Sequence, residues 1–147
     1  MNDTIREKIA KINKEKALCG YNELTGCTKD DIKAFQTWLE ANFNANNELF
    51  SEYIEFVTIA NCLNHNGLYV YGLTEGDKLS IHYMDEVWRL SDEDDRYIFL
   101  AHNDISLYCI DIVSGEYHEL DLGSRSFISA YTSFDDMIDE ALRVALI

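Results

Sequence analysis

Cys109 and His118 are the residues of this chain whose types and spacing could support catalysis. They lie in the stretches ISLYCIDIV and EYHELDL, on either side of Ser114-Gly115. A turn there would place both side chains on facing strands, where a histidine can act as the base for a thiol nucleophile. A cysteine within an apolar strand is more often a packing residue, and no glycine-rich oxyanion loop lies beside it. We therefore expect a pair of sheet neighbours, and a protein that is not an enzyme.

A second group of cysteines, with one histidine, could supply the ligands of a zinc site. Cys62 and His65 form a C-x-x-H pair, and Cys19 with Cys27 would complete four ligands. Structural zinc sites are usually built from closely spaced ligand pairs, yet the chain has no C-x-x-C. The acidic run at 92–95 also lacks the D-x-[DN]-x-[DN]-G frame of a calcium loop. We expect no metal and no cofactor.

Carboxylates dominate the charge of this chain. Its 147 residues carry a net charge of -15, and residues 1–20 alone carry five bases and three acids, so the other 127 residues carry -17. Such a body repels nucleic acid and anionic membranes, whereas it attracts a basic protein and speeds the encounter with it. Acidic surfaces also simply keep proteins soluble. The densest carboxylates, which we expect to contact a partner, are Asp85, Glu86, Asp92, Glu93, Asp94 and Asp95.

The location of the protein is inferred from two missing patterns. The stretch MNDTIREKIAKINKEK alternates charges with isoleucines and lacks the continuous apolar run of a secretory signal. No stretch approaches the roughly 18 apolar residues that a transmembrane helix requires. We expect a cytoplasmic protein, with reduced cysteines and no membrane or nucleic-acid partner.

The elements that must position these residues begin with helices, over about residues 1–62. Ile5, Ile9 and Ile12 share one helical face. CGYNELTGC is predicted to be a loop, and Thr28 with Asp31 resembles a capping box at the start of the next helix. Further helical spacing continues to the asparagine-rich NCLNHNG, which predicts a helix end and a turn.

A sheet is predicted over about residues 67–131. LYVYGL is short, aromatic and bounded by glycines, and KLSIHYM alternates, so both are predicted strands. RYIFLAH is nearly all apolar, which predicts a strand covered on both faces. ISLYCIDIV and EYHELDL then form the hairpin on Ser114-Gly115.

A closing helix is predicted over about residues 133–147. Ser133 can cap it, and Asp135 and Asp136 suit the positive end of the helix dipole. The order of elements predicts a single α+β domain over 1–147, with N-terminal helices, a mainly antiparallel sheet and a C-terminal helix packed on it.

Three segments of the chain resemble the SUKH superfamily, the group of Smi/Knr-type and bacterial YrhA-like proteins. They are LFSEYIEFVTIANCLNHNGLYVYGL (Leu49–Leu73), YIFLAHNDISLYCIDIVSGEYHEL (Tyr97–Leu120) and SFISAYTSFDDMIDEAL (Ser126–Leu142). They follow the family order of helix, Asn/Gly-rich turn and strand, then strand-turn-strand, then an acidic closing helix. The family often has Leu-Pro before its middle helix, whereas Phe50 follows Leu49 here and the chain has no proline.

The resemblance implies a compact α+β domain without a conserved catalytic set. Many bacterial members of the family look like immunity proteins, which bind and neutralise a toxin, often a nuclease, of a polymorphic toxin system. Fungal relatives act as regulatory scaffolds. We therefore expect an immunity protein with a basic toxin as its partner; the alternative is a regulatory or scaffold module that binds another protein or ligand.

Overall fold

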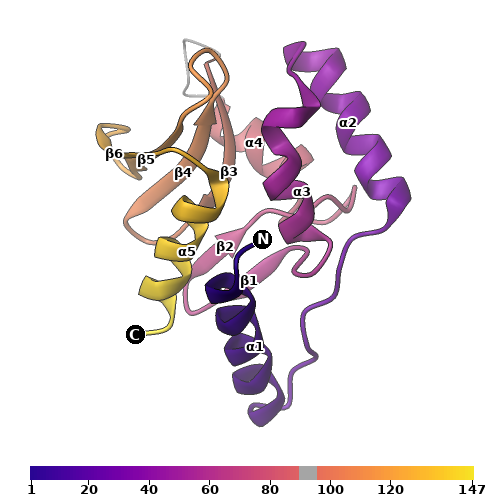
Figure 1. Cartoon of the computed structure of the whole chain (residues 1–147), viewed down its shortest axis with the longest axis vertical. Helices are drawn as coiled ribbons and strands as arrows, with labels where there is room; N and C mark the ends of the chain where they lie inside the picture. Colours follow the sequence, from indigo (N-terminus) through magenta and orange to yellow (C-terminus); the bar gives the residue numbers. More distant parts are fainter. Residues whose placement is uncertain (90–95) are drawn as a thin grey trace.

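The computed structural model describes residues 1–89 and 96–147 of the chain. The elements follow one another as helices, a strand hairpin, a short helix, four strands and a closing helix (Figure 1). This order confirms the predicted α+β class. The elements are α1 (Asp3–Leu18), α2 (Lys29–Phe43), the 3-10 helix η1 (Asn47–Phe50), α3 (Ser51–Val57), β1 (Leu63–His65), β2 (Leu68–Val70), α4 (Ile81–Arg89), β3 (Tyr97–His102), β4 (Ser106–Asp111), β5 (Tyr117–Asp121), β6 (Phe127–Tyr131) and α5 (Phe134–Ala145).

The six strands form one sheet in the order β1-β2-β3-β4-β5-β6, and every neighbouring pair is antiparallel. Helices cover both of its faces, because Phe134 of α5 packs on Tyr117 while Arg89 of α4 lies over Phe99. Tyr117 and Phe99 point to opposite sides, since they pair with the consecutive residues Ile110 and Cys109. All six residues of β4 are buried as a result.

The helix starts follow the local rules of capping. Thr28 and Asp31 form the predicted capping box at the start of α2, and the Ser133 hydroxyl accepts a hydrogen bond from the Asp136 N–H at the start of α5. Helix α1 packs against α5, where the Lys8 ammonium lies 2.6 Å from a carboxylate oxygen of Asp139. Of the helices in the described ranges, none is long and apolar enough to cross a membrane.

One predicted strand is wrong. KLSIHYM enters helix α4 at Ile81, and its contact with the sheet region is an isolated parallel bridge between Ser80 and Gly72. The alternation is only a few residues long, whereas Ile81, Asp85 and Trp88 repeat with helical spacing over a longer window. The longer pattern determines the structure because it buries one continuous face of α4.

The sheet also begins earlier than predicted. Leu63–His65 is already a strand, and it is joined to Leu68–Val70 by the two residues Asn66 and Gly67. Both have positive φ, +48° and +82°, which is the backbone of a tight type I′ hairpin and the reason that Asn-Gly is favoured there. The asparagine-rich segment thus contains a hairpin turn as well as a helix end.

A candidate binding groove between α2 and α4

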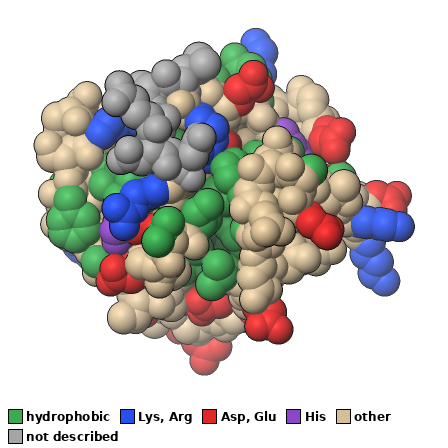
Figure 2. All heavy atoms as spheres, turned by 90° about the horizontal axis from the view of Figure 1, so that it is seen from above, with side chains coloured by type: hydrophobic (Ala, Val, Ile, Leu, Met, Phe, Trp, Pro, Cys, Tyr) green, Lys and Arg blue, Asp and Glu red, His purple; other side chains and the backbone are tan. Residues whose placement is uncertain are grey.

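A groove of about 680 Å³ lies between the C-terminal end of α2 and helix α4. Trp38 and Phe43 line it from α2, His82 and Glu86 line it from α4, and Ile112 follows β4. Figure 2 looks onto this end of the molecule and shows hydrophobic side chains gathered in the middle of the face, beside a ridge of mainly tan atoms. The groove is therefore open to solvent, and its lining combines aromatic with polar and charged side chains.

The aromatic wall of the groove depends on where α2 ends. Asn44 terminates the helix in the left-handed conformation, with φ +49° and ψ +36°, which asparagine adopts more readily than most residues. The Phe43 ring lies 5.1 Å from the Trp38 ring in an edge-to-face arrangement, and His82 lies edge-to-face on Trp38 at 5.4 Å. Trp38 and Phe43 are both half-buried, so part of each ring remains open.

The floor of the groove is held by an ion pair within α4. Asp85 accepts hydrogen bonds from Nε and Nη2 of Arg89, each at 3.0 Å, and from the Phe99 N–H at 3.0 Å. The Arg89 guanidinium lies 4.4 Å from the centre of the Phe43 ring, a favourable cation–π contact. Arg89 thus joins α4 to the end of α2, and its charge is balanced by Asp85.

Two carboxylates of the groove remain without such a partner. Glu40 lies on the α2 side and Glu86 on the α4 side, and both side chains are exposed. Within residues 1–89 and 96–147, neither makes an ion pair or a hydrogen bond. The groove therefore combines aromatic walls with uncompensated negative charge.

His82 adds no positive charge to the groove. Burial lowers the pKa of His82, against the opposing effect of the nearby carboxylates Glu75 and Asp31. The ring is therefore neutral near pH 7. Its Nε2 atom is buried and has no hydrogen-bond partner in the described part of the chain.

The predicted partner contacts fall into three groups. Glu86 lies at the groove as an exposed carboxylate. Asp85 is only 2% exposed, and its oxygens are occupied by Arg89 and the Phe99 N–H, which does not favour a partner contact at this residue. The remaining four, Asp92, Glu93, Asp94 and Asp95, lie outside the described residues.

Cys109 and His118 are confirmed as directly paired residues of β4 and β5. The Cys109 thiol is fully buried and lies 3.5 Å from the main-chain carbonyl oxygen of His118. The His118 ring instead has its Nδ1 atom 3.2 Å from the Tyr97 hydroxyl. This geometry is that of packed neighbours in a sheet, because the thiol contacts the carbonyl and the ring is engaged with Tyr97.

The four considered zinc ligands have separate environments. The Nε2 atom of His65 lies 2.7 Å from a Glu15 carboxylate oxygen, and Cys19 is exposed after α1. Burial raises the pKa of Cys62 to about 11 and also raises that of Cys27, which disfavours the thiolate that a metal needs. No set of three His, Cys, Asp or Glu side chains suited to a metal occurs within the part of the chain that the structure describes.

Four groove residues had no predicted functional role: Trp38, Phe43, His82 and Arg89. Trp38 and Phe43 match the apolar stripe of a helix, a pattern that ordinarily indicates core residues. The signal for Arg89 was its i,i+4 spacing from Asp85, which suits a helical ion pair. It was not used because no helix was predicted over the residues that follow KLSIHYM.

Comparison with known proteins adds no assignment to this geometry. No protein-family model matches the chain, and no curated protein matches it either. The function is therefore argued from the charge of the molecule, the residues of the groove and the resemblance of its sequence segments.

Proposed function

We propose that this chain is a non-enzymatic protein-binding domain of SUKH type, an immunity protein that neutralises a basic toxin of a bacterial polymorphic toxin system. The observation that carries the proposal is the charge of -17 on residues 21–147. The three sequence segments that resemble the SUKH superfamily support the choice of an immunity role over other binding roles.

The physical basis is charge complementarity with a nuclease. A nuclease must present positive charge to the phosphates of its substrate. An acidic inhibitor can meet the same surface, accelerate association through long-range attraction and exclude the substrate. Neutralisation of this kind requires binding alone and needs no catalytic group.

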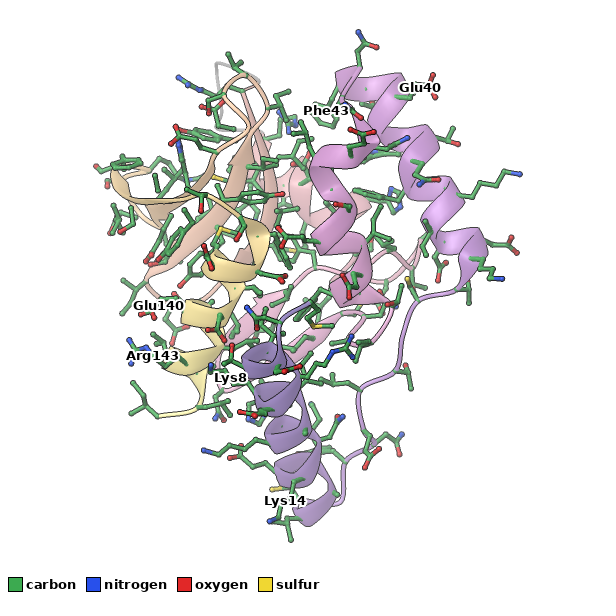
Figure 3. The ribbon with its side chains drawn as sticks, viewed as in Figure 1. Lys8, Lys14, Glu40, Phe43, Glu140 and Arg143 are labelled. Carbon is green, nitrogen blue, oxygen red and sulfur yellow. The ribbon has the colours of Figure 1, made fainter. Side chains whose placement is uncertain are left out.

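The distribution of charge can also orient the encounter. Lys8 and Lys14 of α1 lie at the end of the molecule opposite Glu40 and Phe43 of α2 (Figure 3). Lys8 is already paired with Asp139, whereas Glu40 and Glu86 at the groove have no partner among the described residues. A basic partner is therefore attracted to the groove end. This asymmetry favours the groove end as the interface.

The test is a pull-down with the toxin encoded next to this gene, followed by a nuclease assay. We expect capture at low salt, where electrostatic attraction is least screened, and loss of nuclease activity at a one-to-one ratio. Absence of binding at low salt would overturn the proposal for that pair. Capture without loss of toxin activity would instead favour a regulatory or scaffold role.

A further inference from the structure

We infer that the groove between α2 and α4 is an anchor site for an arginine side chain of the partner, which lies against Trp38 and pairs with Glu40 and Glu86. The inference rests on the proposed function in one respect, that the partner is a basic protein. It goes further by naming the position of contact and the side chain that is recognised.

The size of the groove suits a long side chain. The groove volume of about 680 Å³ lies within the roughly 300–1,000 Å³ typical of ligand sites. Interfaces gain most of their binding energy from a few side chains that enter such pockets, with arginine among the most frequent. The groove is thus large enough for one long side chain and the residues that flank it.

The charge of the groove favours a cation. The arginines near this end of the molecule already have partners: Arg89 pairs with Asp85, Arg96 pairs with Asp111, and Arg125 lies over the Trp88 ring. Glu40 and Glu86 have no partner among the described residues. A cation entering the groove therefore gains two carboxylates, whereas an anion would be repelled by them.

Arginine fits this groove better than lysine does. A planar guanidinium stacks on aromatic rings and can donate to two carboxylates at once, whereas an ammonium is a compact and strongly hydrated charge. Arg89 already makes a contact of this kind within the chain, with its guanidinium 4.4 Å from the Phe43 ring centre and two hydrogen bonds to Asp85. Trp38 stacks on Phe35, and the exposed part of its ring lines the groove. Tryptophan is the best cation–π partner.

The test uses N-acetyl-argininamide as a probe of the intact chain. The chain has two tryptophans, Trp38 and Trp88, so the indole N–H signals in an NMR spectrum can be assigned with the Trp38→Phe variant. We expect a saturable shift of the Trp38 signal, which N-acetyl-lysinamide reproduces only weakly and an uncharged alaninamide does not. No saturable shift, or an equal shift with the lysine probe, would overturn the inference.

Matched variants test whether Glu40 and Glu86 are responsible for binding of the arginine probe. Glu40→Gln with Glu86→Gln removes two exposed charges at the groove, and Glu7→Gln with Glu23→Gln removes two exposed charges that do not line it. The groove pair should weaken probe binding at least about fivefold, the size expected for two exposed ion pairs, while the control pair should change it less than about twofold. Equal effects of the two pairs would contradict a specific anchor.

The same variants separate this inference from the proposed function. A toxin that binds wild-type chain and the Glu40→Gln, Glu86→Gln variant with equal affinity contradicts the anchor and leaves the immunity role standing. A wild-type chain that binds the arginine probe but no toxin contradicts the immunity role and leaves the anchor standing.

Discussion

Asp85 and Glu86 are consecutive carboxylates with opposite roles. Asp85 is buried between Arg89 and the Phe99 N–H, whereas Glu86 is exposed and has no partner within the described residues. Their charge is the same, so composition alone could not separate them. Only the helical phase of α4 decides which of the two faces the core.

This difference gives a prediction for unfolding stability. Asp85→Ala removes the buried carboxylate that pairs with Arg89 and accepts from the Phe99 N–H, so it should lower the free energy of unfolding by about 3 kcal/mol. Glu86→Ala should change it by less than about 0.5 kcal/mol, as is usual for an exposed residue without contacts. Urea unfolding of both variants measures the difference, and similar losses would contradict the roles assigned here.

Asp111 gives a prediction for the pH dependence of stability. Burial acts to raise its pKa, but Arg96 and the main-chain N–H groups of Val113 and Ser114 outweigh burial, and the net shift lowers the pKa. A carboxyl whose pKa is lower when folded stabilises the protein above its unfolded pKa of about 3.9, and this contribution is lost as the pH falls through the folded pKa.

The variant Asp111→Asn should therefore be less stable than wild type by about 1–3 kcal/mol at pH 7. The difference between the two proteins should shrink as the pH falls below about 4. The pKa values of Asp121 and Glu140 are also lowered. These two residues contribute equally to the stability of wild type and variant, so they cancel in the difference. A difference that stays constant down to pH 2 would contradict the ionic role of Asp111.

At the scale of elements, the connection from α1 to α2 is fixed by its contact with α3. The Cys27 N–H donates to the Val57 carbonyl at 2.9 Å, and the Asn61 N–H donates to the Thr25 carbonyl at 2.8 Å. Between them, a Cβ atom on Gly26 would lie 1.9 Å from the Thr58 carbonyl oxygen. Glycine is required at this position because two main-chain segments meet there.

Gly26→Ala should therefore destabilise the protein by about 1–3 kcal/mol or more, as overpacking against a backbone does. Gly123→Ala is the matched control, since its Cβ would lie at an ordinary distance of 3.5 Å from an Asp121 carboxylate oxygen. Thermal unfolding of the two variants provides the measurement. Equal melting temperatures would show that the connection is not held against α3.

The elements also show which parts of the fold could be predicted from the sequence. The capping box at Thr28, the closing helix at Ser133 and the pairing of Cys109 with His118 were predictable, because each depends on residues close together in the chain. Helix α4 was not predicted, because its residues overlap a short alternating run that resembles a strand, while its helical spacing appears only over a longer window. The groove could not be predicted from the sequence, because Trp38 and His82 come into contact only when α2 and α4 pack together.

At the scale of the whole molecule, the N-terminal helix differs in charge from the rest of the chain. Helix α1 holds all five bases of residues 1–20 and lies at the end opposite the C-terminal end of α2 (Figure 1). The rest of the chain is strongly acidic. This difference is the physical feature from which both the immunity role and its proposed interface are argued.

The most direct test of the central claim is the association rate constant with the adjacent-gene toxin, measured by stopped flow from about 20 mM to 500 mM salt. We predict fast association at low salt that falls at least about tenfold across the series, as electrostatic steering requires. The Glu40→Gln, Glu86→Gln variant should associate more slowly than the Glu7→Gln, Glu23→Gln variant at every low-salt point. No complex at 20 mM salt, or a rate constant independent of salt, would contradict the account.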